Sequence, residues 1–188
     1  MICHIMGLHE AAYKYIDLII STARFSTPEG SIRRVTEIAE VSKDWADKPK
    51  YVDLFEDDRK HDLLIPAKFL RGSKRLIKQL NSYDLSHVNV TAAAKHVEFL
   101  PSERGGSYYI PAACERLAIE QRDFLTSILA EARMKSDLLM LARRTGNASY
   151  MELPFVSKSY DIYFALVKRH VPDYKKVLGG WRTWLKAQ

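Results

Sequence analysis

The longest continuous run of helix-favouring residues extends from Ala112 to Arg144, and this run constrains the fold more than any other segment. Its length suits two helices, or one helix with a bend near Lys135, and the pair Gly146 and Asn147 is a typical helix end. One core with an appended helical extension is therefore the simplest organisation for a chain of 188 residues, which we expect to form a single domain.

Two more helices are expected in the tail. The residue pattern predicts them over 160–170 and 174–186, and Pro172 separates them. Glycine is a poor helix former, so we expect Gly179 and Gly180 to break or bend the second of these helices.

The N-terminal part is also predicted to be helical. Apolar residues recur with a 3.6-residue period from Leu8 to Phe25, which favours a helix packed on a core. Thr27, Pro28 and Glu29 then have the pattern of a cap and an acidic first turn of a second helix. We therefore expect N-terminal helices within residues 1–42.

The middle of the chain favours strands and one short helix. Strands are expected at Tyr51–Phe55 and Leu63–Pro66, and an amphipathic helix at Gly72–Leu80. A hairpin is expected between 94–100 and 108–110, with a glycine turn between its strands. The predicted fold class is therefore α+β.

No membrane span, zinc site or disulfide framework is expected. Charged residues interrupt every apolar stretch well before the roughly 20 residues that a transmembrane helix needs. The N-terminus also lacks the basic start and long apolar run of a secretory signal. Cys3 and Cys114 are far apart and have no CxxC spacing. We expect a cytoplasmic protein.

Positive charge is concentrated at the C-terminal end. Residues 133–188 contain 11 of the 29 Lys and Arg residues but only 4 of the 23 Asp and Glu residues. This basic helical extension predicts an acidic partner such as DNA, with basic side chains on phosphates and aromatic ones stacked on bases. Alternatively, the aromatic residues form a core and the basic ones a solvated rim. The candidate DNA-binding residues are Lys158, Lys168, Arg169, Lys175, Lys176 and Arg182.

A candidate anion site follows the last predicted strand of the middle segment. Residues 62–122 are expected to run strand, helix, strand, glycine turn, strand, helix, so that the last strand leads into a helix start. Free backbone N–H groups and an arginine in such a turn can bind phosphate, although the same spacing suits a purely structural turn. The turn consists of Ala112, Ala113, Cys114, Glu115 and Arg116.

The segment from Gly105 to Ala118 resembles the ParB/sulfiredoxin superfamily, in which a glycine turn and an aromatic strand lead into a phosphate-gripping turn at a helix start. The stretch Leu64–Leu70 resembles the opening strand of that family. The resemblance implies a ParB/sulfiredoxin-like core over 62–132 with N- and C-terminal helices added. The sequence departs from the family pattern at Ala113 and Leu117, where the family has glycine and arginine.

This resemblance also implies site residues and ligands. Ala112, Ala113, Cys114 and Arg116 would hold a nucleotide phosphate, with ATP as ligand and Mg²⁺ as an optional metal. Catalytic roles would belong to Glu115, Arg116 and Cys114. No histidine spacing typical of a metal site is present, so no metal ligands are assigned.

The overall form resembles plasmid-encoded oncogenic-suppression and fertility-inhibition proteins, which share the ParB/sulfiredoxin fold. That resemblance implies a factor that blocks substrate transfer through a conjugative type IV secretion system. Its partners would be DNA and the type IV secretion coupling protein, and ATPase and DNase activity are associated with the group. The alternatives are a protein-binding inhibitor with a vestigial phosphate turn and a sulfiredoxin-like redox enzyme, which would need an exposed Cys114 with a lowered pKa.

Overall fold

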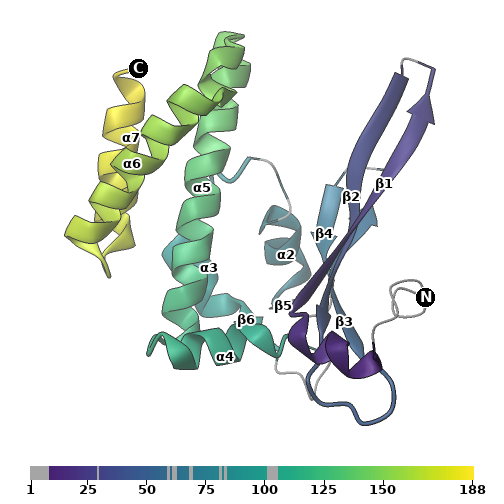
Figure 1. Cartoon of the computed structure of the whole chain (residues 1–188). Helices are drawn as coiled ribbons and strands as arrows, with labels where there is room; N and C mark the ends of the chain where they lie inside the picture. Colours follow the sequence, from purple (N-terminus) through teal and green to yellow (C-terminus); the bar gives the residue numbers. More distant parts are fainter. Residues whose placement is uncertain are drawn as a thin grey trace. The chain divides into compact units, whose positions relative to one another are not determined.

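The computed structural model describes residues 9–28, 30–58, 60, 63–67, 70–80, 82, 84–100 and 106–188 (Figure 1). It has the mixed α+β composition predicted from the sequence. The chain divides into two compact units, each of which takes two stretches of sequence. The strand unit contains the described residues up to Arg71 and Phe99–Ala118, and the helical unit contains Gly72–Glu98 and Ile119–Gln188.

The strand unit is built on a four-stranded antiparallel sheet in the order β1-β2-β3-β4. A 3₁₀ helix, η1, precedes it at Glu10–Tyr15. The strands are β1 at Leu18–Thr27, β2 at Gly30–Val41, β3 at Tyr51–Asp58 and β4 at Leu63–Pro66. The β3 and β4 strands confirm the sequence prediction.

Within the described residues of 1–42, the predicted N-terminal helices are reduced to the 3₁₀ helix η1, and the prediction is wrong for the strands β1 and β2. Residues 18–41 form a long hairpin, and Thr27 pairs with Gly30 across its turn. The apolar residues of this segment fit a two-residue period as well as a helical one, and many are β-branched, which favours a strand once a partner is present. Residues 1–8 lie outside the described part of the chain.

The predicted hairpin over 94–110 is also wrong. Residues 90–96 form helix α3 (Val90–His96), because the Asn89 side chain accepts a hydrogen bond from the Ala92 amide at 3.1 Å and caps it. After the two-residue strand β6 (Glu98–Phe99), residues 109–116 form helix α4 (Tyr109–Arg116). The glycine turn at Gly105 lies outside the described residues. Strand β6 pairs with β5 (Leu70–Arg71), and helix α2 (Lys74–Leu80) confirms the short helix expected there.

The helical unit is organised around α5 (Gln121–Thr145). Helices α6 (Leu153–His170) and α7 (Tyr174–Lys186) lie beside it, joined to it through the 3₁₀ helix η3 (Ala148–Met151) (Figure 1). The predicted helix end at Gly146 is confirmed, and this glycine adopts a left-handed conformation with φ of 67°.

The two-helix alternative for the long helical run is confirmed, since α4 ends at Arg116 and α5 begins at Gln121, and Ala118 between them has a φ of 52°. The alternative of a bend near Lys135 is wrong, because α5 runs from Gln121 to Thr145. The second tail helix passes through Gly179 and Gly180 without a break, because Val177, Leu178 and Trp181 are buried and hold it in place. None of the helices among the described residues combines the length and apolar character needed to cross a bilayer.

Candidate nucleic-acid interface

The structure places the expected phosphate turn inside a helix. Helix α4 begins at Tyr109, and the Ala112 amide donates to the Tyr108 carbonyl at 3.4 Å. Ala112, Ala113 and Cys114 therefore lie within α4, and the predicted helix start at Ala112 is wrong. Their backbone groups follow the helical pattern and do not form an open anion site.

The true N-terminus of α4 already holds an anion of the chain itself. The carboxylate of Glu40, from β2, accepts hydrogen bonds from the backbone amides of Tyr108 and Tyr109, both at 2.7 Å. It also accepts one from the Ser107 hydroxyl at 2.5 Å. Glu40 is only 1% exposed, so this carboxylate is an internal cap that uses the first amides and the positive end of the helix dipole.

The remaining residues of the expected turn do not fit a phosphate group. Arg116 lies in the last turn of α4, where its Nε donates to the Ala112 carbonyl at 3.4 Å and its guanidinium is 5.4 Å from the centre of the Tyr109 ring. Glu115 is exposed. Cys114 is 3% exposed, and burial raises the pKa of its thiol, the opposite of what a reactive cysteine needs.

A metal site is not found in the described part of the chain either, since it contains no group of three His, Cys, Asp or Glu side chains placed to hold an ion. Binding of ATP and Mg²⁺ stays a prediction from the sequence resemblance.

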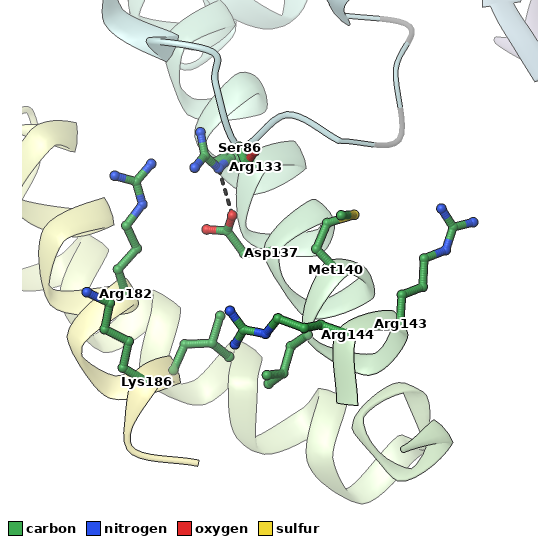
Figure 2. Close-up of a pocket in the computed structure, with 10 residues that line it drawn as sticks. Ser86, Arg133, Asp137, Met140, Arg143, Arg144, Arg182 and Lys186 are labelled. Carbon is green, nitrogen blue, oxygen red and sulfur yellow. Dashed lines mark hydrogen bonds and ion pairs between the residues drawn. The ribbon is translucent and has the colours of Figure 1, made fainter. Parts of the chain in front are cut away.

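A basic groove lies in the helical unit. It consists of two adjoining cavities of about 680 and 650 Å³, which share Ser86 and Arg182 (Figure 2). In the first cavity, Arg143 and Arg144 come from the end of α5, whereas Arg182 and Lys186 come from α7. The second cavity adds Lys175 from the start of α7 and His87 from the loop before α3. The groove therefore collects cationic side chains from two helices.

The basic residues of α7 that line the groove share one face of that helix. Lys175, Arg182 and Lys186 follow one another at intervals of seven and four residues, which is close to a whole number of 3.6-residue turns. The opposite face carries the fully buried Val177 and Trp181. The same packing that anchors α7 thus turns its basic stripe into the groove.

Gly179 lies on this stripe, between Lys175 and Arg182, and lines the second cavity. A Cβ atom at this position would meet nothing within 4 Å, so packing does not explain a glycine there. Gly180 differs, because a Cβ there would lie 2.8 Å from a methyl group of Leu166. A glycine inside a helix lowers the stability by about 0.5–1 kcal/mol relative to alanine. At Gly179, the missing side chain leaves open space on the groove side of α7.

An ion pair between two residues of α5 lies in the wall of the first cavity. The Nε of Arg133 donates to Asp137 Oδ1 at 2.8 Å (Figure 2). The same guanidinium donates to the carbonyl oxygens of Leu85 and Val88, which ties the loop before α3 to α5. The Arg133 guanidinium is therefore already bonded within the protein, and we do not count it among the cations that could bind a ligand.

Only part of the predicted DNA-binding set lines the groove. Lys175 and Arg182 do, whereas Lys176 is exposed and pairs with Asp173 at 3.2 Å. Hydrogen bonds from the Lys176 backbone and side chain hold the pKa of Asp173 below its usual value. The other three candidates, Lys158, Lys168 and Arg169, are exposed on α6 and line neither cavity of the groove.

Sequence reasoning missed Arg143 and Arg144 as members of the groove. Lys186 belongs to the basic tail pattern, and its spacing from Lys175 and Arg182 places it on the same helical face. For the two arginines of α5, no comparable signal exists, because their place beside α7 depends on helix packing.

The aromatic residues of the tail form a core. Trp181 and Tyr163 are buried, with ring centres 6.5 Å apart, and Trp184 lies 5.1 Å from Trp181. Burial raises the pKa of Tyr163 well above its usual value. The alternative of a packed aromatic core is therefore confirmed for Trp181 and Tyr163, and these two rings are not available to stack on bases.

No protein-family model matches this chain, and no curated protein matches it. The functional argument therefore depends on the geometry and charge of the basic groove. Arginine and lysine side chains in a row, with open space between them, are best suited to bind phosphate groups.

Proposed function

We propose that the helical unit binds the phosphate backbone of DNA in the basic groove. The observation that carries the proposal is the stripe of Lys175, Arg182 and Lys186 on one face of α7, with Arg144 of α5 pointing toward it (Figure 2). The stripe extends about 16 Å along the helix axis, given a rise of 1.5 Å per residue. It is longer than a single phosphate, which favours a polymeric anion over a small one.

The binding is expected to be indifferent to base sequence. Cationic contacts to phosphate carry no base information, and Trp181 and Tyr163 are buried away from a ligand. Affinity would come mainly from counterion release and would fall steeply with salt.

The sequence resemblance adds a biological setting to this proposal. The chain would act as a plasmid fertility-inhibition factor of the kind represented by the oncogenic-suppression protein Osa, which blocks transfer through a conjugative type IV secretion system. DNA binding in the groove, together with contact to the coupling protein, would then interfere with substrate export. This setting, and the associated ATPase and DNase activities, depends on the sequence resemblance alone.

The test compares two matched double variants of the full chain. Arg182→Gln with Lys186→Gln removes one arginine and one lysine from the groove. Lys168→Gln with Arg169→Gln removes the same two charges from α6, away from the groove. Binding of a short labelled DNA duplex is measured by fluorescence anisotropy over a series of salt concentrations.

We expect the groove variant to lose affinity and its log–log salt slope to decrease by about 1.8, since each phosphate contact contributes about 0.9. The α6 variant should show a much smaller change. Equal losses in the two variants would mean that only net charge matters and that the groove is not the site.

A second candidate function is a protein-binding inhibitor with a vestigial phosphate turn. The observation that favours it is the occupation of the α4 N-terminus by Glu40, which leaves Tyr108 and Tyr109 no free amide for a nucleotide. Such a factor would still inhibit conjugative transfer after Arg116→Ala. A loss of inhibition in that variant would contradict it.

A further inference from the structure

The β1–β2 hairpin extends beyond the rest of the sheet as a two-stranded arm. Strand β3 pairs with β2 only from Glu37 to Val41, so residues 30–35 of β2 pair with β1 alone (Figure 1). The matching part of β1 is 22–27. Six residues at about 3.3 Å each give the arm a length of about 20 Å.

One face of this arm is exposed along its whole length. Directly opposed residues in an antiparallel pair point to the same side, and the pairs Arg24–Arg33 and Thr22–Val35 alternate with pairs that point to the other side. All six residues of the first face are exposed. They are Thr22, Arg24, Ser26, Ser31, Arg33 and Val35.

The Arg24–Arg33 pair is unfavourable in the isolated protein. Like charges directly opposite each other across two strands destabilise the pairing. Among the described residues, no acidic side chain forms an ion pair with either arginine, so none of these carboxylates relieves the repulsion. The two arginines and Arg34 help line a shallow cavity of about 470 Å³ on the arm.

An anionic partner would turn this repulsion into attraction. Two guanidinium groups held side by side by the strand register can each form a bidentate contact with a phosphate. The width of a two-stranded ribbon also fits the major groove of B-DNA, which is about 12 Å wide. Charge and shape therefore indicate the same ligand.

We propose that the exposed face of the β1–β2 arm is a second DNA-binding surface, with Arg24 and Arg33 on the phosphates of duplex DNA. The inference rests on the proposed function for its ligand, but its residues belong to the strand unit and not to the basic groove. The two sites therefore contribute separate phosphate contacts and can be tested separately.

The experiment uses the full chain with Arg24→Gln and Arg33→Gln combined. The matched control is Lys48→Gln with Lys50→Gln, which removes two exposed positive charges from the loop before β3 in the same unit. Duplex binding is measured over a salt series, and thermal unfolding is recorded for each protein. Vesicles containing anionic phospholipid serve as a second ligand.

The arm variant is expected to bind DNA more weakly, with a salt slope smaller by about 1.8, because two phosphate contacts at about 0.9 each are lost. Its Tm should be equal to or higher than that of the wild type, since the opposed charges are gone. The lysine control should retain nearly the full slope.

An arm variant that binds DNA like the lysine control would overturn the inference, and so would a variant that loses binding to vesicles but not to DNA. The Arg182→Gln, Lys186→Gln variant separates this result from the proposed function. If that variant loses DNA binding while the arm variant does not, the groove remains a DNA site and only the arm is excluded.

Discussion

Glu40 and Ser107 are 67 positions apart in the sequence, and yet the Ser107 hydroxyl donates to the Glu40 carboxylate at 2.5 Å in the interior of the strand unit. The Ser107 oxygen in turn accepts from the Ile110 amide at 3.0 Å. Together with the amides of Tyr108 and Tyr109, these bonds satisfy the first turn of α4 and join it to the end of β2. One buried carboxylate thus determines where α4 begins.

Replacing this carboxylate should destabilise the strand unit strongly. Glu40→Ala would leave two backbone amides and a hydroxyl buried without their acceptor, and hydrogen bonds to a charged group contribute about 1.5–3 kcal/mol each. We therefore expect a loss of at least about 3 kcal/mol in the free energy of unfolding, measured by urea denaturation. Glu37→Ala, on the same strand but exposed, is the control and should stay within about 0.5 kcal/mol of the wild type.

Gly179→Ala should raise the stability of the protein and at the same time lower its affinity for DNA. The new methyl group meets nothing in the fold, so the helix propensity of alanine should raise the free energy of unfolding by up to about 1 kcal/mol. The same methyl group would project into the basic groove and lower the affinity for duplex DNA. Anisotropy titration and thermal unfolding of one preparation measure both effects.

Gly180→Ala provides the control, because its methyl group would press on Leu166 and not on the groove. The displacement of the Leu166 methyl group should offset part of the gain in helix propensity, so the stability gain should be smaller than for Gly179→Ala, and DNA affinity should stay nearly unchanged. A Gly179→Ala variant that is more stable and binds DNA as well as the wild type would show that the ligand does not approach this part of α7.

The Cys114 thiol should be unreactive in the folded protein. Burial raises its pKa, so the thiol stays protonated at pH values where an exposed cysteine begins to ionise. In a Cys3→Ser background, alkylation by iodoacetamide should be slow at neutral pH and should accelerate when the protein is unfolded in guanidinium. Rapid alkylation of the folded chain at neutral pH would instead support the sulfiredoxin-like alternative.

Arg116→Ala should leave nucleotide chemistry unchanged. Arg116 lies at the C-terminal end of α4, where it contacts the Ala112 carbonyl and the Tyr109 ring and not an open anion site. We therefore expect wild type and variant to give the same rates of phosphate release from ATP and of plasmid cleavage, with and without Mg²⁺. Activity in the wild type that disappears in the variant would place catalysis at this helix after all.

The helices of the C-terminal half could be predicted because their signals are local. Gly146 can adopt the left-handed conformation that ends α5, and Pro172 cannot continue α6. Asp173 caps α7 through the amide of Lys176, only three positions away. The basic stripe on α7 follows from the same sequence periodicity.

The hairpin and the start of α4 could not be predicted in this way. The apolar residues of 18–41 fit both a helix and a strand, and only cross-strand partners such as Ile20 and Ile38 favour the strand. Similarly, Tyr109 and Ile110 are β-prone, and it is the distant Glu40 that caps a helix there.

By itself, the sequence determined the mixed fold class, the helical tail, the helix ends at Gly146 and Pro172 and the concentration of positive charge in the last third. Each of these depends on composition or on residues within one or two helical turns. Tertiary structure alone decided that Arg24 faces Arg33, that Arg144 lies near Lys186 and that Cys114 is buried. These relationships depend on strand register and helix packing between distant segments, because burial and pairing energies are set by neighbours in space.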